Sequence, residues 1–164
     1  MFYEFIKSPN FWKGRRGFKP EAIVIHITEG TASSTIDWFT RIESQVSSHY
    51  LIDRSGKVYQ FVKEEDTAWH AGKVVQASWK LLKQGVNPNL YTIGIELEGF
   101  DDQKPTFIQA LMTSAIISII CQRWKIPLDD QHIIPHRWIR RDKKCPGKGI
   151  DVKALVYLAK IIKN

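Results

Sequence analysis

The chain has 164 residues, of which 43% are hydrophobic and 25% are charged, a balance typical of one soluble globular domain with a real core. The formal net charge of +7 favours an anionic polymer as partner, either nucleic acid or bacterial wall with its acidic peptides and teichoic acids. The most apolar run, Ala110–Cys121, is too short to span a bilayer, and the N-terminus lacks the apolar core of a signal peptide. We therefore expect cytoplasmic synthesis without a signal peptide and no membrane insertion.

Strands and helices are predicted to alternate along the chain. Residues 1–20, which are aromatic and basic with Gly and Pro breaks, are predicted to be an arm packed on a domain of residues 21–164. The predicted elements of that domain are a strand over Glu21–Ile27, a helix from Ser33 or Ser34 to about Ser44, a hairpin of His49–Asp53 and Lys57–Val62, a strand over Tyr91–Glu98, a helix over Thr106–Trp124, a strand over His132–Ile134 and a helix from Asp151 to about Lys163. This interleaving predicts an α/β fold, a single domain whose mixed central sheet is flanked by helices.

The segment Pro135–Gly149, with the sequence PHRWIRRDKKCPGKG, holds His136 and Cys145 with a basic run between them. A His at a strand end and a Cys in the following loop can face one metal ion, and His26 in the run Ala22–Ile27 is the best candidate for a third ligand. Two imidazoles and a thiolate would leave the fourth tetrahedral position open, as in a catalytic zinc site. The alternative is that Cys145 is a loop thiol, His136 a surface residue and His26 a satisfied core residue. The other cysteine, Cys121, lies in an apolar helical run and is predicted to be a buried, inert thiol.

The predicted strand Tyr91–Glu98 carries a candidate catalytic carboxylate. Glu96 and Glu98 share one face of the strand, and its other face is apolar, so the acidic face should line a cleft or meet solvent. Gly94 on the acidic face indicates close approach by another group. A carboxylate beside an open zinc position can take a proton from water in metal-assisted hydrolysis, and the alternative is a solvent-facing pair.

Two shorter motifs add candidate residues. Lys143 and Lys144 precede Cys145, and a cation there could stabilise an oxyanion, although a solvated basic loop explains a single Lys equally well. Trp69 and His70 are followed by Ala-Gly, a combination of aromatic, His and small residues that suggests a groove admitting a ligand.

Five stretches, in order along the chain, resemble the zinc-dependent N-acetylmuramoyl-L-alanine amidases, which include phage lysozyme-type amidases, cytosolic anhydro-muropeptide amidases and peptidoglycan recognition proteins. The stretches are IVIHIT with His26, SSHYLIDRSGKVYQFV, AWHAG with His70, YTIGIELEG with Glu96, and PHRWIRRDKKCPG with His136 and Cys145. The resemblance implies a mixed sheet flanked by helices, a zinc cleft on one side, and hydrolysis of the amide that joins the lactyl group of N-acetylmuramic acid to L-alanine.

The resemblance also implies roles for individual residues. It implies that His26, His136 and Cys145 bind Zn²⁺, that Glu96 is the catalytic glutamate, and that His70 lies in the substrate groove. Phage-type members have a Tyr before the His of the second stretch, where this chain has Ser48, so Glu96 should bear the role of base. Lys143 matches the family lysine two positions before the ligand, but the adjacent Lys144 leaves one position of ambiguity.

The sequence is compatible with three functions. The first is a monomeric amidase that cuts peptidoglycan or a muropeptide, either as an endolysin-like enzyme that acts on the wall after release or as a cytosolic enzyme that recycles anhydro-muropeptides. The second is a non-catalytic muropeptide-binding module; such members generally lack a ligand, whereas this chain keeps all three. The third is nucleic-acid binding, which only the net charge suggests, so we expect no nucleic-acid partner.

Overall fold

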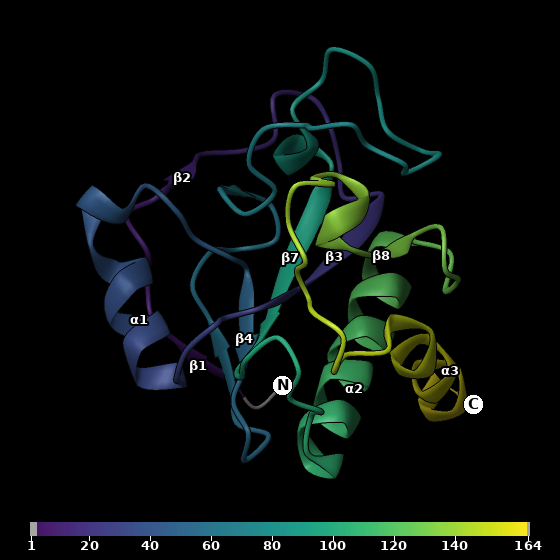
Figure 1. The fold of residues 1–164 in the computed structure, drawn as a ribbon. Helices are drawn as coiled ribbons and strands as arrows, with labels where there is room; N and C mark the ends of the chain where they lie inside the picture. The colour runs from purple at the N-terminus through teal and green to yellow at the C-terminus, as the bar shows by residue number, and fades with distance from the viewer. Residues whose placement is uncertain (1–2, 164) are drawn as a thin grey trace.

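The computed structural model describes residues 3–163 and shows a six-stranded sheet with helices packed around it (Figure 1). The strand order is β1-β5-β4-β7-β3-β8, with β3 parallel to both neighbours and β4 antiparallel to β5. The strands of this sheet are β1 (Tyr3–Phe5), β3 (Ala22–Ile27), β4 (Tyr50–Ile52), β5 (Val58–Gln60), β7 (Thr92–Leu97) and β8 (Ile133–Pro135). The helices are α1 (Ala32–Thr40), α2 (Phe107–Trp124) and α3 (Val152–Lys163), with 3₁₀ turns η1 (Ile42–Ser44), η2 (Pro88–Leu90) and η3 (His136–Trp138). The predicted α/β class with a mixed sheet is confirmed.

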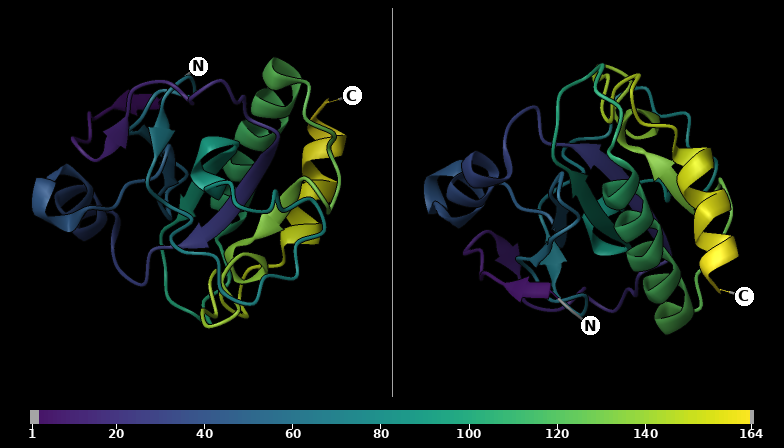
Figure 2. Two further views of the ribbon diagram at one scale, coloured as in Figure 1. Left: turned by 90° about the horizontal axis from the view of Figure 1, so that it is seen from above. Right: turned by 90° about the horizontal axis from the view of Figure 1, so that it is seen from below.

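Strand β3 lies inside the sheet and is buried along its whole length, as its β-branched sequence predicts. Ile23, Ile25 and Ile27 belong to the main core with α2 and α3, which run side by side along one face of the sheet (Figure 2). Ala22 and Val24 point to the other face and pack in a second core under the loops that surround η2. Since side chains alternate along a strand, His26 must also lie on this second face.

Helix α2 is a core helix. Among the described residues it is long and apolar enough to cross a membrane by length and composition alone. In the structure Ile116, Ile117 and Ile120 are buried against the sheet, and Ser114 bonds to Leu155 in α3. Its apolar character is therefore explained by packing on two sides, as its two apolar stripes predict.

Helix α1 differs from its prediction at both ends. It begins at Ala32, because the side chain of Thr31 accepts a hydrogen bond from the backbone N–H of Ser34 and the Ser34 side chain caps Thr31 in return. It ends at Thr40, since Arg41 leaves helical geometry, and the residues predicted to continue the helix form the separate turn η1.

The predicted arm, residues 1–20, contributes to the sheet. Residues 1 and 2 lie outside the described part, and Tyr3–Phe5 pair in parallel with β5 as an edge strand. Further along, β2 (Phe11–Trp12) pairs with β6 (Thr67–Ala68). Arg15 is buried, and its guanidinium donates to the carbonyls of Glu64, Asn89, Leu90 and Thr92. The arm is thus anchored to the loops that surround the second core.

Candidate active site

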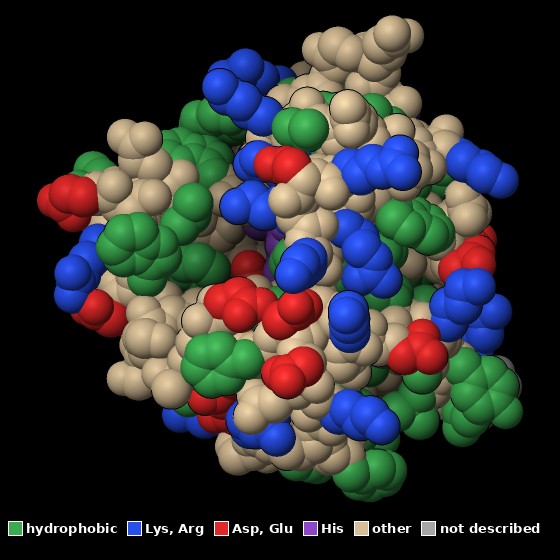
Figure 3. Space-filling view, in the orientation of Figure 1, with side chains coloured by type: hydrophobic (Ala, Val, Ile, Leu, Met, Phe, Trp, Pro, Cys, Tyr) green, Lys and Arg blue, Asp and Glu red, His purple; other side chains and the backbone are tan. Residues whose placement is uncertain are grey.

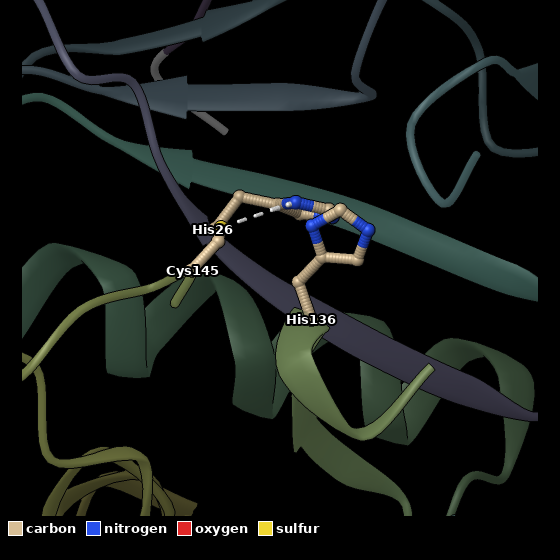
Figure 4. A group of neighbouring side chains, drawn as sticks. All are labelled: His26, His136 and Cys145. Carbon is tan, nitrogen blue, oxygen red and sulfur yellow. Dashed lines mark hydrogen bonds between the residues drawn. The ribbon is translucent and has the colours of Figure 1, made fainter. Parts of the chain in front are cut away.

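His26, His136 and Cys145 converge at the carboxyl ends of parallel strands (Figure 4). The register explains this, because Ile25 in β3 pairs with Pro135 at the end of β8, and the residue after each of them is a histidine. The loop after η3 then folds back, with the Arg137 N–H donating to the carbonyl of Cys145 at 2.9 Å. One ligand atom from each of the three side chains lies within 4.8 Å of the others, so they could hold one metal ion.

Hydrogen bonds fix which nitrogen of His136 is free. Its Nε2 lies 3.0 Å from the backbone carbonyl of Ala71, and a carbonyl oxygen can only accept, so Nε2 carries the proton. The lone pair of His136 is therefore on Nδ1. Metal-binding histidines usually donate their other ring N–H to an oxygen atom in this way, which fixes the orientation of the ring.

His26 is oriented by a relay of two residues. The Thr92 hydroxyl donates to the carbonyl of Pro88 at 2.8 Å, so it accepts from Nε2 of His70 at 3.2 Å. Nδ1 of His70 then accepts from Nε2 of His26 at 3.1 Å. This assignment from the hydrogen-bond partners leaves the lone pair of His26 on Nδ1, which faces the Cys145 sulfur at 3.7 Å.

The electrostatics of the cluster suit a metal cation. Burial lowers the pKa of His26 well below 6.5 and lowers that of His136, so both imidazoles are neutral. Burial, aided by the Glu96 carboxylate, raises the pKa of the Cys145 thiol, while the Ile27 N–H donates to its sulfur at 3.4 Å. A metal would therefore have to displace the thiol proton on binding. Two imidazole nitrogens and one thiolate are donors that zinc accepts, so these residues fit that ion.

Glu96 lies beside the cluster, as the alternation in its strand predicts. Ile93, Ile95 and Leu97 are in the main core, and Glu96 pairs directly with His26 across the sheet. Its Oε1 is 4.0 Å from Nδ1 of His26, and its Oε2 is buried with no hydrogen-bond partner among the described residues. Burial raises the pKa of Glu96 to about 8. Without a cation in the cluster this carboxyl is therefore mostly protonated at neutral pH, whereas the charge of a bound metal ion would favour the carboxylate, which could then accept a proton through its unpartnered oxygen.

Glu98 has a different role from Glu96. Its two oxygens accept from the backbone N–H groups of Ala32 and Arg54, at 2.9 and 2.8 Å. Glu98 therefore holds the start of α1 and the β4–β5 turn in place, which makes it a structural residue two positions from the candidate base.

Open space flanks the cluster. A pocket of about 390 Å³ is lined by Glu96 together with Thr28, Glu29 and Trp38. A second pocket, of about 700 Å³, is lined by Trp69 and Trp12. In the space-filling view a hollow opens on this face with a histidine visible at its floor (Figure 3). The site is thus reachable from solvent.

Gly94 is required by the ring of His70. A Cβ built on Gly94 would lie 2.6 Å from Cγ of His70 and 2.7 Å from Oγ of Ser48, closer than real contacts allow. We expect Gly94→Ala to displace His70 from His26 and to cost about 1–3 kcal/mol of stability through overpacking. Thermal unfolding and metal content of the purified variant would check this, with Gly85→Ala as a control because a Cβ there meets open space, although its φ of +73° adds strain. Wild-type stability and metal content in Gly94→Ala would contradict the close contact.

The two lysines before Cys145 are both exposed, and both line a third pocket beside the loop. The charge of Lys143 contributes to the lowered pKa of His136, after burial and the nearby Arg140. Lys143 is therefore close enough to the cluster to act on it electrostatically, in keeping with its position two residues before the ligand.

The sequence prediction missed the groups that orient the histidines. Thr92 was not singled out, although it lies on the same strand face as Gly94 and Glu96, so extending that alternation by one step would have found it. Ala71, whose carbonyl holds His136, lies within the AWHAG motif, but the contact joins residues 65 positions apart and no local pattern encodes it.

The fold and the cluster define a class of α/β protein. In this class two imidazoles, a thiol and a carboxylate lie together at the carboxyl ends of parallel strands. Within that class, the family model described as N-acetylmuramoyl-L-alanine amidase matches residues 16–148. The chain therefore belongs to the N-acetylmuramoyl-L-alanine amidase family, as the five motifs predict.

Individual relatives agree with this assignment. The chain is 33% identical over 126 residues to N-acetylmuramoyl-L-alanine amidase A of Achromobacter lyticus, covering 70% of this chain and 63% of the relative. It is 35% identical over 112 residues to the 1,6-anhydro-N-acetylmuramyl-L-alanine amidase AmpD of Haemophilus influenzae, covering 66% of this chain and 56% of the relative. The matched regions thus span less than two thirds of these curated relatives.

Solved structures show the same fold. A selenomethionine derivative of AmpD superposes with a TM-score of 0.80 at 25% identity, covering 96% of this chain and 94% of that one. AmiD from Escherichia coli, in complex with the substrate anhydro-N-acetylmuramic acid-L-Ala-D-γ-Glu-L-Lys, has a TM-score of 0.71 at 26% identity, covering 85% of this chain and 57% of AmiD.

Proposed function

We propose that the protein is a zinc-dependent N-acetylmuramoyl-L-alanine amidase, which hydrolyses the amide between N-acetylmuramic acid and L-alanine. The observation that carries the proposal is the placement of Glu96, opposite His26 in the sheet and within 4.0 Å of its Nδ1, beside a cluster that fits zinc. Family membership and the muropeptide held by the related AmiD support the choice of substrate.

The proposed reaction assigns a task to each residue. His26 and His136, through Nδ1, and Cys145 would hold Zn²⁺, which when bound supplies Lewis acidity toward the scissile carbonyl and the attacking water. Glu96 accepts a proton from that water and delivers it to the departing amine of L-alanine. His70 and Thr92 keep His26 in the tautomer that can bind a cation. Trp69 lines the pocket of about 700 Å³ and would contact substrate there. His70 lines neither of the two pockets, and its structural task is to support His26.

Lys143 is proposed to stabilise the negative charge that develops on the carbonyl oxygen. We expect Lys143→Ala to lower kcat by roughly 10²–10³, the effect of losing one oxyanion donor. Lys144→Ala is the matched control, because it removes the same charge from the adjacent exposed position. Turnover of a soluble muropeptide measures both variants. A large loss of turnover in Lys144→Ala with normal turnover in Lys143→Ala would assign stabilisation of the oxyanion to Lys144 instead.

The decisive experiment for the function measures the products that the enzyme releases from purified peptidoglycan. We expect new L-alanine amino groups to appear without new reducing sugars. Reducing ends without free amines would identify a glycosidase instead, and binding of muropeptide with neither product would identify the non-catalytic module.

We further propose that the substrate is polymeric wall peptidoglycan, with the enzyme acting as an endolysin-like monomer on the wall after release from the cytoplasm. The net charge of +7 supports an anionic polymer as substrate. The similarity to AmpD favours the second candidate, a cytosolic enzyme that recycles anhydro-muropeptides. Turnover of intact sacculi and of soluble anhydro-muropeptide, measured side by side, distinguishes the two.

A further inference from the structure

A cationic pocket of about 670 Å³ lies beside the loop that carries Cys145. Buried Ile133, Ile150 and Val152 give it an apolar floor. Its rim carries five cationic side chains, Arg137, Lys143, Lys144, Lys148 and Lys153, and two acidic ones, Asp130 and Asp151. None of the three candidate metal ligands lines it, so the cationic pocket lies outside the ligand cluster, and Lys143, the proposed oxyanion donor, stands where the two adjoin.

The cations at the pocket outnumber the acidic side chains, five to two. Residues 137–148 contain six Lys or Arg and one Asp. That Asp, Asp142, is paired with Arg140 at 2.6 Å, and neither residue lines the pocket. In the part of the chain that the structure describes, none of the five rim cations forms an ion pair, and the side chain of Asp151 at the pocket is occupied in capping α3.

Five cations around one pocket repel one another, so the arrangement favours a ligand that brings several negative charges. The apolar floor favours a ligand that also has uncharged carbon atoms between those charges. A chain of phosphodiesters joined by short polyols has both properties, since its phosphates can meet the rim while its carbons cover the floor. Several Lys and Arg side chains gather beside the hollow on the side where this loop runs, and Asp and Glu gather below the hollow (Figure 3).

We propose that the cationic pocket binds a phosphodiester polymer of the bacterial wall, of the poly(glycerol phosphate) or poly(ribitol phosphate) type. The choice of this polymer as the ligand rests on the proposed function, because an enzyme that acts on peptidoglycan would meet such a polymer in the same wall. Binding would hold the enzyme against its substrate while leaving the hollow open. The pocket thus adds a wall-binding site within the catalytic domain itself.

The test compares two double variants of equal charge. Lys148→Glu/Lys153→Glu reverses two rim charges, and Glu at position 153 suits the first turn of α3. Lys19→Glu/Lys160→Glu makes the same change in total charge at two exposed positions outside the pocket. Cosedimentation on ice uses purified walls that either retain or have been stripped of their phosphodiester polymers. Turnover of a soluble muropeptide and circular dichroism verify that both variants are folded, with Lys148→Gln/Lys153→Gln as a milder replacement.

We expect the rim variant to bind polymer-bearing walls at least about tenfold more weakly, the scale of one lost charged contact, and the control variant to bind within about twofold of wild type. Stripped walls should bind all three proteins equally weakly. Purified poly(glycerol phosphate) should compete, and inorganic phosphate at the same phosphate concentration should not.

Four results would overturn the proposal: equal losses in both variants, tight binding to stripped walls, equal competition by double-stranded DNA, or equal competition by inorganic phosphate. The first would assign the effect to net charge alone, and the last two would identify a nucleic-acid or a free-phosphate site. A protein that binds walls as expected but releases no amines from them would instead disprove only the proposed amidase function.

Discussion

Glu96→Ala is expected to lower kcat by roughly 10²–10⁴ while the zinc content and the fold stay unchanged. The reason is that Glu96 lies beside the cluster without being one of its ligands, so removing it takes away a proton acceptor and leaves the two imidazoles and the thiolate in place. The measurements are single-turnover release of L-alanine amino groups from a soluble muropeptide, metal content and circular dichroism.

Glu98→Ala is the matched control for this variant. It removes a carboxylate two residues further along, just past the end of β7, whose oxygens bond to backbone N–H groups of Ala32 and Arg54. We expect Glu98→Ala to lower stability by about 1–3 kcal/mol, since it leaves those donors unpaired, and to change kcat little. Wild-type turnover in Glu96→Ala would mean that the base is another group.

Cys145→Ser is expected to abolish both zinc binding and activity. A serine hydroxyl stays protonated at neutral pH, so the site would lose its one anionic ligand. The bound zinc should fall from about one ion per chain to a small fraction of that, and a chelator should lower the melting temperature of the wild type but not of the variant. Metal analysis and thermal unfolding with and without chelator make the measurement.

Cys121→Ala serves as the control for Cys145→Ser. Cys121 is a free thiol of α2 that is buried as predicted, and burial raises its pKa to about 12, which favours the unreactive protonated form. We expect this variant to keep its zinc and its turnover, with a modest loss of stability. Retention of zinc by Cys145→Ser, or loss of zinc by Cys121→Ala, would show that the thiolate ligand has been assigned wrongly.

The elements that the sequence predicts well are those with a local cause. The apolar run of β3, the alternation in β7 and the stripes of α2 each depend on neighbours within a few residues, and each is found within a residue or two of its predicted range. The predicted start of α1 is wrong because Thr31 and Ser34 cap each other. The sequence signature of such mutual capping normally has Glu or Gln at the third helical position, where this chain has Ser34.

The parts that could not be predicted depend on contacts between distant residues. Burial of Arg15 requires carbonyl groups from three other segments, whereas an arginine alone in sequence is expected at the surface. The residues of the candidate site could be named from sequence motifs. Their mutual geometry could not, because it depends on the registers that pair His26 with Glu96 and Ile25 with Pro135.

The candidate metal ligands come from distant parts of the chain, since His26 and Cys145 are 119 residues apart. At a synthesis rate of about 5–20 residues per second, on the order of ten seconds separates the appearance of the first ligand from that of the last. A growing or prematurely ended chain that lacks β8 and its loop therefore has neither the complete ligand set nor the strand that positions it. If the proposed zinc chemistry holds, a hydrolase of this design becomes active only after the chain has been made as far as Cys145 and the loop that carries it has folded.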